Sequence, residues 1–279
     1  MTRTLFVPCS VDGLHKAGSI RIRCEWVADN WEGAEVWDGT QRLVPDDWDL
    51  VVFQKAYLLQ ATRGMIERVA EWRDAGGCAL AFDLCDPDHL DRKHRERMMR
   101  VLGLFDFCVG STERLTAWLA RWNAAYHVPD CVDVAAMREI GVHKPRDVDE
   151  PYLVWAGYER NAGALHALLP AVGRLGWPLE VMSLAKSIPF ENYWARVLRN
   201  SETGEQHDVL LNPRPTIGHY AWKSDNKTQT AWALGMPVAR TARELEGFAD
   251  PERRVPGEPR GIEVAVERWR EIAEEWARS

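Results

Sequence analysis

Residues 223–227, Lys-Ser-Asp-Asn-Lys, and residues 228–238 after them, TQTAWALGMPV, decide the fold of this chain. Ser224 or Asp225 can cap a helix, Gly235 can end it, and the apolar residues that follow can begin a strand. The pattern therefore predicts a loop, a helix and a strand, in that order.

The same stretch carries charges that suit a diphosphate. A helix N-terminus offers backbone N–H groups and a partial positive charge to an anion. Lys223 and Lys227 stand at i and i+4, a spacing that would place two ammonium groups beside that helix end. The stretch predicts an anion site, and the alternative is a pair of solvated surface lysines.

Composition limits the classes of protein to consider. The chain has 279 residues, enough for one large domain or for two, and 42 acidic against 35 basic residues give a net charge of −7. Such a chain has no overall basic field to draw it to nucleic acid or to an anionic membrane, although a local patch could do so.

Cysteine usage and hydropathy bear on location. The six cysteines form no C-x-x-C pair and several lie in apolar stretches, which favours reduced, buried thiols and a cytoplasmic protein. The apolar opening at 4–9 is too short for a signal peptide, and no run approaches the roughly 20 apolar residues of a membrane span.

Strand-like and amphipathic stretches alternate along the chain, as a parallel sheet with helical crossovers requires. Strands are expected at 4–9, 34–37, 49–54, 78–83, 105–109 and 125–128, and again at 152–156, 179–182, 208–211 and 236–239. Helices are expected at 18–29, 61–75, 89–102, 112–122, 161–175, 190–199 and 226–234.

A polar segment bounded by prolines, residues 141–151, separates two such series. We therefore expect an N-terminal domain at 1–145 and a second domain at 146–260. Residues 261–279 are expected to form a C-terminal helix that packs on the domains, because Ile262, Val266 and Trp269 recur at helical spacing.

Six further segments support this organisation: AGSIRIR at 17–23, DLVVFQK at 49–55, AFDLCD at 81–86, VPDCVD at 128–133, LVWAG at 153–157 and DVLLNP at 208–213. Together with residues 223–238, their order resembles that of the GT-B glycosyltransferases, in particular the retaining, family-four-like branch (glycosyl transferases group 1). The resemblance implies two Rossmann-like α/β domains, with parallel sheets flanked by helices and a cleft between them. It also implies sugar transfer from a nucleoside-diphosphate sugar to a hydroxyl.

The resemblance assigns the donor site to the second domain, where loops that follow parallel strands bind ligands. Lys223, Asn226 and Lys227, with Ser224, would hold the diphosphate, and Arg160 would clamp a phosphate. The remaining donor-side candidates are Gly157 and Tyr158 at the phosphate turn, Ser183 and Lys186 near the nucleoside, and Asn212, His219 and Tyr220 in the sugar pocket. An exposed arginine at a helix start is the alternative reading of Arg160.

The acceptor side is expected in the first domain. His15 or Asp12, in the loop after the first strand, could accept the acceptor's hydroxyl proton, with Lys16 and Arg21 nearby. Asp86 and His89 follow the fourth strand beside Asp83 and Asp88. This group could hold magnesium, but hydroxyl binding, or helix capping by Asp86 or Asp88, is preferred. No metal and no other cofactor is expected to be obligatory, because helix dipoles and cations can neutralise the leaving diphosphate.

Two positions depart from the family pattern. Better-known members carry two glutamates eight positions apart around the donor helix, where this chain has Trp222 and Thr230. The family's Arg and Lys pair after the first strand of the second domain is reduced here to Arg160. Nucleotide contacts and retaining stereochemistry are therefore expectations only.

The acceptor's class stays open. A basic run, Arg92-Lys93-His94-Arg95-Glu96-Arg97-Met98-Met99-Arg100, could bind the phosphates of a nucleic acid or of a lipid-linked acceptor, or be a solvated face. The acceptor could be a glycan, a small molecule or a hydroxymethylated DNA base, which would have to be extruded from a duplex. A nucleotide-sugar epimerase and a non-catalytic sugar- or nucleic-acid-binding protein are the alternatives, and the oligomeric state is unknown.

Overall fold

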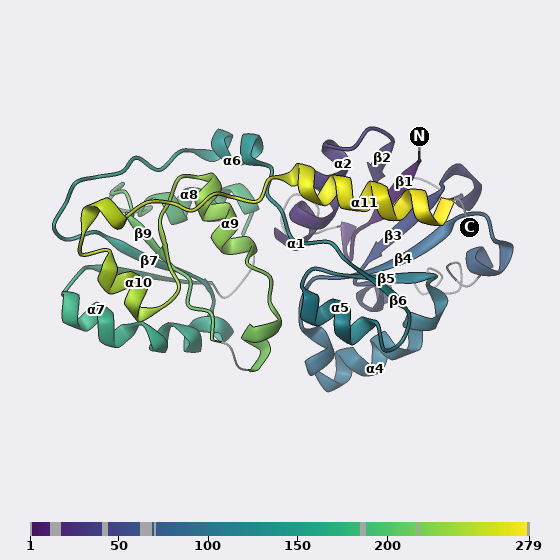
Figure 1. Ribbon diagram of the computed structural model, residues 1–279, viewed down its shortest axis with the longest axis horizontal. Helices are drawn as coiled ribbons and strands as arrows, with labels where there is room; N and C mark the ends of the chain where they lie inside the picture. The colour runs from purple at the N-terminus through teal and green to yellow at the C-terminus, as the bar shows by residue number, and fades with distance from the viewer. Residues whose placement is uncertain are drawn as a thin grey trace. The chain divides into compact units, whose positions relative to one another are not determined.

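The structure is a computed structural model that describes residues 2–11, 18–40, 44–61, 69, 71–184, 188–215 and 218–277. The chain forms two compact units, which can be followed by colour in Figure 1. Unit 1 comprises the chain up to Cys131 with residues 222–224 and 261–279, and unit 2 comprises residues 132–221 and 225–260. Each contains a parallel sheet flanked by helices, which confirms the predicted α/β fold class.

The sheet of unit 1 has six parallel strands in the order β2-β1-β3-β4-β5-β6. The strands are β1 (Thr4–Val7), β2 (Ala34–Val36), β3 (Leu50–Gln54), β4 (Ala79–Leu84), β5 (Phe107–Gly110) and β6 (Ala124–His127). Its central strands β1, β3 and β5 are buried along their whole length. Helices cover both faces of such a sheet, which is why these segments are apolar almost throughout.

The helices of unit 1 begin at capping residues where the sequence supplies them. Asp91 accepts a hydrogen bond from the backbone N–H of His94, and Thr112 caps its helix through Leu115. The elements are α1 (Gly18–Ile20), the π-helix η2 (Arg21–Glu25), α2 (Trp26–Asp29), α4 (Arg92–Val101), α5 (Glu113–Leu119) and α11 (Ile262–Ala277), with the 3₁₀ turns η3 (Pro45–Asp47), η4 (Ala56–Ala61), η5 (Asp88–Leu90) and η6 (Leu102–Leu104).

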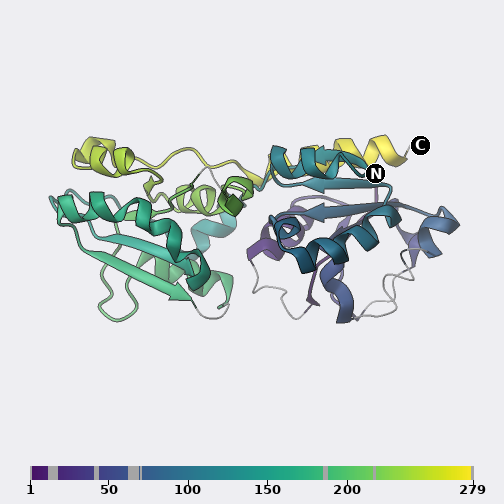
Figure 2. The ribbon, with the colours of Figure 1, turned by 90° about the horizontal axis from the view of Figure 1, so that it is seen from below.

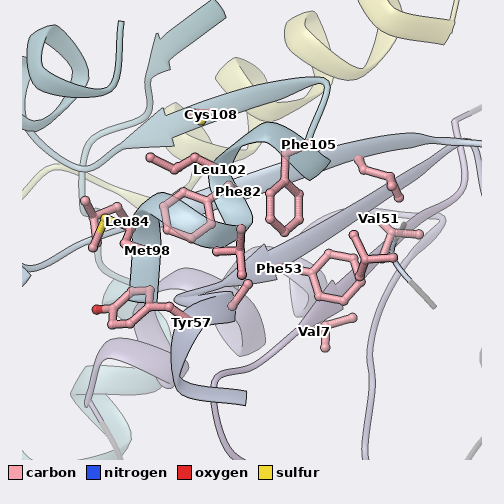
Figure 3. Packing of buried hydrophobic residues seen from close by; sticks show 14 of the residues in the cluster. Val7, Val51, Phe53, Tyr57, Phe82, Leu84, Met98, Leu102, Phe105 and Cys108 are labelled. Atoms are coloured by element: carbon pink, nitrogen blue, oxygen red, sulfur yellow. The ribbon is translucent and has the colours of Figure 1, made fainter. Parts of the chain in front are cut away.

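Alternate residues of β1 serve the two faces of this sheet. Leu5 and Val7 join the buried cluster of Figure 3, in which β3, β4, α4 and α5 also take part. Phe6 lies on the opposite face, where its ring meets that of Trp269 of α11 edge to face at 5.6 Å. The C-terminal helix therefore packs on unit 1, and two of the many tryptophans, Trp269 and Trp276, serve that packing.

Unit 2 has four parallel strands in the order β10-β9-β7-β8. They are β7 (Leu153–Tyr158), β8 (Leu179–Leu184), β9 (Val209–Leu211) and β10 (Val238–Ala239). The helices are α6 (Val134–Ile140), α7 (Leu169–Leu175), α8 (Phe190–Leu198), α9 (Asn226–Ala233) and α10 (Ala242–Gly247), with the 3₁₀ segments η7 (Glu159–Ala167), η8 (Gly218–Trp222) and η9 (Pro251–Arg253). Helix α7 lies along one face of this sheet (Figure 2), where Leu168 and Ala171 join a second core.

The structure differs from the expected elements in a few places. The helix expected at 161–175 is a 3₁₀ segment followed by α7, which restarts at Leu169 because Pro170 favours a first helical turn. The short helices α6 and α10 are not anticipated by the sequence pattern. The proline-bounded segment at 141–151 packs along unit 2: His143 N–H donates to Leu234 O at 2.7 Å, and Arg146 forms an ion pair with Asp208 at 2.6 Å. The compact units therefore separate after Cys131, earlier than the expected boundary at 145.

No disulfide joins the six cysteines, all of which are described, in agreement with the reduced thiols that the sequence predicts. Burial raises the pKa of each thiol whose shift is resolved, for example that of Cys108 to about 12. Within the residues described above, no helix combines the length and the apolar character needed to cross a membrane.

Candidate functional site

The carboxyl ends of β7, β8 and β9 bring three donor-side candidates to one edge of the sheet in unit 2. Gly157 of β7 is in register with Ser183 of β8, and Asn212 directly follows β9. Ligands bind at this edge of open parallel sheets. Tyr158, the last residue of β7, is 38% exposed.

Lys227 reaches the same edge from the first turn of α9. Its Nζ donates to the carbonyl oxygen of Ala156 at 2.6 Å. A Cβ added at Gly157 would lie 3.4 Å from that Nζ and 3.2 Å from the ring of Trp155. The glycine thus leaves room for the ammonium beside the end of β7, where the sequence predicts the phosphate turn.

The N-terminus of α9 is held in place by side chains outside its first turn. Asn212 Nδ2 donates to Thr228 Oγ1 at 2.8 Å, which ties β9 to the helix. Asp225 is the N-cap residue, but it makes no side-chain cap; its carboxylate accepts from Gln229 Nε2 at 2.8 Å and faces Arg260. The side chain of Asp225 therefore does not cap the N–H groups of the first turn, which suits an anion site.

Ser224 does not cap this helix, contrary to one expectation. Its hydroxyl donates to the carboxylate of Asp130 in unit 1, and Thr112 Oγ1 donates to the carbonyl of neighbouring Trp222 at 3.3 Å. Lys223 is half-buried and lies before the helix, so it does not share the helical i, i+4 geometry with Lys227. The reason is that α9 begins only at Asn226.

The remaining donor candidates are only partly defined. Tyr220 donates its hydroxyl to Asn161 O at 3.3 Å, and the ring of His219 lies 3.8 Å from that of Tyr220. The backbone of Arg160 lies in the first turn of η7, and its side chain is outside the described part of the structure. Lys186 lies outside the described residues.

At the carboxyl edge of the sheet in unit 1, Arg23 of η2 faces two buried carboxylates. Its Nε donates to Asp83 at 3.2 Å, a second nitrogen donates to the same carboxylate, and the third lies 3.3 Å from Asp130. Burial opposes the charge on Arg23, but the two carboxylates outweigh it and raise the pKa of the guanidinium. Burial raises the pKa of Asp130 to about 6, against the opposing effect of Arg23.

A second charged group lies along the same edge. Lys55 follows β3 with φ at +48°, a left-handed conformation uncommon for a residue other than glycine. Its ammonium donates to Asp86 and lies 3.3 Å from Asp88, which also accepts from the hydroxyl of Tyr57. Burial would lower the pKa of Lys55, but Cys85, Asp86 and Asp88 raise it well above its usual value.

These contacts correct the capping alternative and show how the carboxylates at this edge are paired. Asp91 caps α4, so neither Asp86 nor Asp88 is needed there. Asp83 is engaged by Arg23, and Asp86 by Lys55. Across the described part of the chain, no three His, Cys, Asp or Glu side chains are grouped to hold a metal ion.

His89 of η5 is 3% exposed. Its ring stacks on that of Trp118 at 4.5 Å and meets that of Trp222 edge-on at 4.5 Å. Neither ring nitrogen has a hydrogen-bond partner among the described residues. Burial lowers the pKa of His89 to about 4, so the ring is neutral at pH 7 and able both to donate and to accept.

The remaining acceptor-side candidates are Arg21, Asp12, His15 and Lys16. Arg21 forms an ion pair with Glu25 of its own helix at 3.0 Å. Asp12, His15 and Lys16 lie outside the described residues. The contacts of Arg23 and Lys55 were missed from the sequence, although both belong to the segments that carried the resemblance; their partners lie far along the chain, and no local signal marks such pairs.

The fold of this chain can be compared with those of known proteins. No family model matches the chain, and no curated protein matches it. Solved structures do: Anabaena HepE in complex with UDP-glucose has a TM-score of 0.52 and 12% identity over 100% of this chain and 99% of that one. The catalytic domain of starch synthase IV from Arabidopsis thaliana, bound to ADP and acarbose, has a TM-score of 0.54 and 6% identity, covering 100% of both.

A third structure is an alpha-glucosyltransferase in complex with UDP-glucose and DNA containing an abasic site, with a TM-score of 0.55 and 10% identity over 98% of each chain. These proteins are GT-B glycosyltransferases. At such low identity the likeness establishes the fold alone. The chain therefore has the GT-B type of two-domain α/β fold, and its activity has to be argued from its own residues.

Proposed function

We propose that this protein is a GT-B-type glycosyltransferase that moves a sugar from a nucleoside-diphosphate sugar to a hydroxyl acceptor. The observation that carries the proposal is the ammonium of Lys227, held 2.6 Å from Ala156 O at the carboxyl end of β7, beside Gly157. A cation at that strand end, next to a helix N-terminus without a side-chain cap, suits a diphosphate. The nucleotide sugars and nucleotides bound by the three similar structures support this choice of ligand.

In this reaction the bond between the sugar carbon and the diphosphate oxygen breaks, and a bond to the acceptor oxygen forms. The diphosphate leaves with the bonding electrons, and Lys227, Lys223, Asn226 and the first-turn N–H groups of α9 stabilise its negative charge, assisted by Arg160. The acceptor proton passes to a base, for which His15 and Asp12 are the candidates. The retaining outcome, and a reaction that needs no metal, belong to the same proposal.

Ligand-induced stabilisation tests the donor site. A true donor present at about a hundredfold excess over its Kd stabilises the native state by about 2.7 kcal/mol, which raises Tm measurably. We expect one nucleoside diphosphate and its sugar conjugate, from a panel of bases, to raise the Tm of the wild type and not that of Lys227→Ala. Lys144→Ala, which removes an exposed lysine of the same unit, should respond like the wild type.

The same pair of variants tests catalysis. Loss of one preorganised cation should lower kcat by about 10²–10³, or roughly 3–4 kcal/mol of transition-state stabilisation. The readout is nucleoside diphosphate released with the acceptor present. A Lys227→Ala variant that is folded and turns over like the wild type would remove the proposal.

A further inference from the structure

Helix α4 concentrates positive charge in an acidic protein. It carries Arg92, Lys93, Arg95, Arg97 and Arg100 against a single acidic residue, Glu96. Arg92, the partner of Glu96, has a side chain that is 86% exposed. Arg95 and Arg100 are exposed and Arg97 is half-buried, and none of these three has an ion-pair partner among the described residues.

The exposed side of α4, its outward face, is mainly cationic. At about 100° per residue, Lys93, Arg97 and Arg100 lie within a stripe roughly 60° wide. Arg92 and Arg95 lie to one side of this stripe, where Glu96 and Met99 stand among them. Met98 and Val101 are buried in the core of unit 1. Helix α5 packs into the same core; it carries the exposed Arg114, and the exposed Arg121 follows its end.

The spread of these charges selects the kind of ligand. Arg92 and Arg100 are separated by about 12 Å along the axis, too far for one phosphate to bind both. Duplex DNA presents one charge per roughly 1.7 Å of its axis, so it can engage the whole face together. An interfacial membrane helix inserts an apolar face into lipid, whereas the apolar residues Met98 and Val101 of α4 are already buried.

The place of α4 connects this face with the candidate acceptor groups. The helix starts at the carboxyl end of the sheet in unit 1, directly after η5, which carries Asp88 and His89. We propose that the outward face of α4 binds the phosphate backbone of DNA, and that the acceptor hydroxyl of the proposed transferase is on a polynucleotide. The DNA-binding part stands on α4 alone, and the acceptor part rests on the proposed function.

DNA binding can be measured by fluorescence anisotropy with a labelled duplex of about 20 base pairs, between about 50 and 200 mM salt. We expect the wild type to bind with a strong salt dependence. The triple variant Lys93→Gln, Arg97→Gln, Arg100→Gln should bind about tenfold or more weakly, with a log–log salt slope shallower by up to about 2.7, the value for three lost phosphate contacts. Arg100→Gln alone, at an exposed position, serves if the triple variant does not fold.

The matched control changes net charge equally in unit 2. Arg174→Gln, Arg243→Gln, Arg253→Gln removes three exposed arginines and should bind DNA like the wild type. The inference would be overturned if both triple variants lost the same amount of affinity for DNA. It would also be overturned if the wild type did not bind DNA at low salt. Leu90, just before α4, is 48% exposed, so binding to a lipid surface has to be compared. The probe is vesicles of phosphatidylcholine and phosphatidylglycerol. Binding to these vesicles in place of DNA would also overturn the inference.

The two proposals fail separately. A nucleotide-dependent rise in Tm without DNA binding leaves the glycosyltransferase intact and refutes the polynucleotide surface. If the protein binds DNA through α4 but no nucleotide raises its Tm, the DNA-binding face of α4 is supported. The glycosyltransferase proposal and the polynucleotide acceptor are then refuted.

Discussion

At the scale of single residues, Arg23 is the centre of a buried ion-pair group in unit 1. One guanidinium serves two carboxylates, Asp83 and Asp130, and all three groups are at most 3% exposed. Burial disfavours the charged form of the Asp130 carboxyl and raises its pKa to about 6, although Arg23 acts in the opposite direction.

This raised pKa predicts a specific dependence of stability on pH. The folded protein binds a proton at Asp130 more tightly than the unfolded chain, whose aspartates titrate near 3.8. The resulting stabilisation is complete below about pH 4 and is lost as pH rises through about 6. The free energy of unfolding of the wild type minus that of Asp130→Asn should therefore fall between those values, by roughly 2 kcal/mol or less, and be flat above them.

Urea unfolding of both proteins at a series of pH values measures that difference. Asn keeps an oxygen that can accept from Ser224, so the comparison isolates the titration from the hydrogen bond. A difference that rises with pH across the same window would contradict the assignment.

At the candidate site, the sequence predicts the place of a residue within a helix or strand, but not its contacts with residues far along the chain. The sequence predicts Lys227 in the first turn of a helix and Gly157 at the end of a strand, because helix starts and strand ends have local signatures. The partners of Arg23 and Lys55 could not, since Arg23 and Asp83 are 60 residues apart and a single sequence carries no signal for such a pair.

At the scale of elements, the junction of β5 with α5 is tightly packed around Gly110. A Cβ added there would lie 2.6 Å from the backbone nitrogen of Thr116 and 3.0 Å from its Cα. These are backbone atoms of α5, so the strand and the helix would have to separate.

Gly110→Ala should therefore lower the free energy of unfolding by about 1–3 kcal/mol, the usual cost of overpacking. Gly103→Ala is the matched control in the same unit, because nothing lies within 4 Å of its added Cβ. Denaturant unfolding measures both, and equal stabilities of the two variants would show that α5 can shift at no cost.

Element prediction succeeded where burial sets the pattern. The central strands of unit 1 read as uninterrupted apolar runs because they are covered on both faces. The short helices α6 and α10 escaped prediction, since a helix of about two turns contains too few residues for a periodic pattern to stand out.

At the scale of the whole molecule, each unit has a core of its own, and the chain order does not follow the units. Residues 261–279 return to unit 1 after unit 2 is complete. Sequence alone predicted a final helix with an apolar stripe, but it could not choose which sheet the stripe covers, because either core would accept it.

This arrangement predicts that a core substitution in α11 lowers the stability of unit 1. Trp269 is 0% exposed and its ring packs on Phe6 of β1, so Trp269→Ala should lower stability by about 3–5 kcal/mol. Native-state hydrogen exchange should quicken in β1 and β3 and stay unchanged in β7 and β9, whose side chains pack in the separate core of unit 2. Trp122→Ala is the control, because it removes the same side chain at a position that is 54% exposed. It should change neither the stability nor the exchange rates. Equal acceleration in both sheets would mean that the two units unfold as one cooperative body.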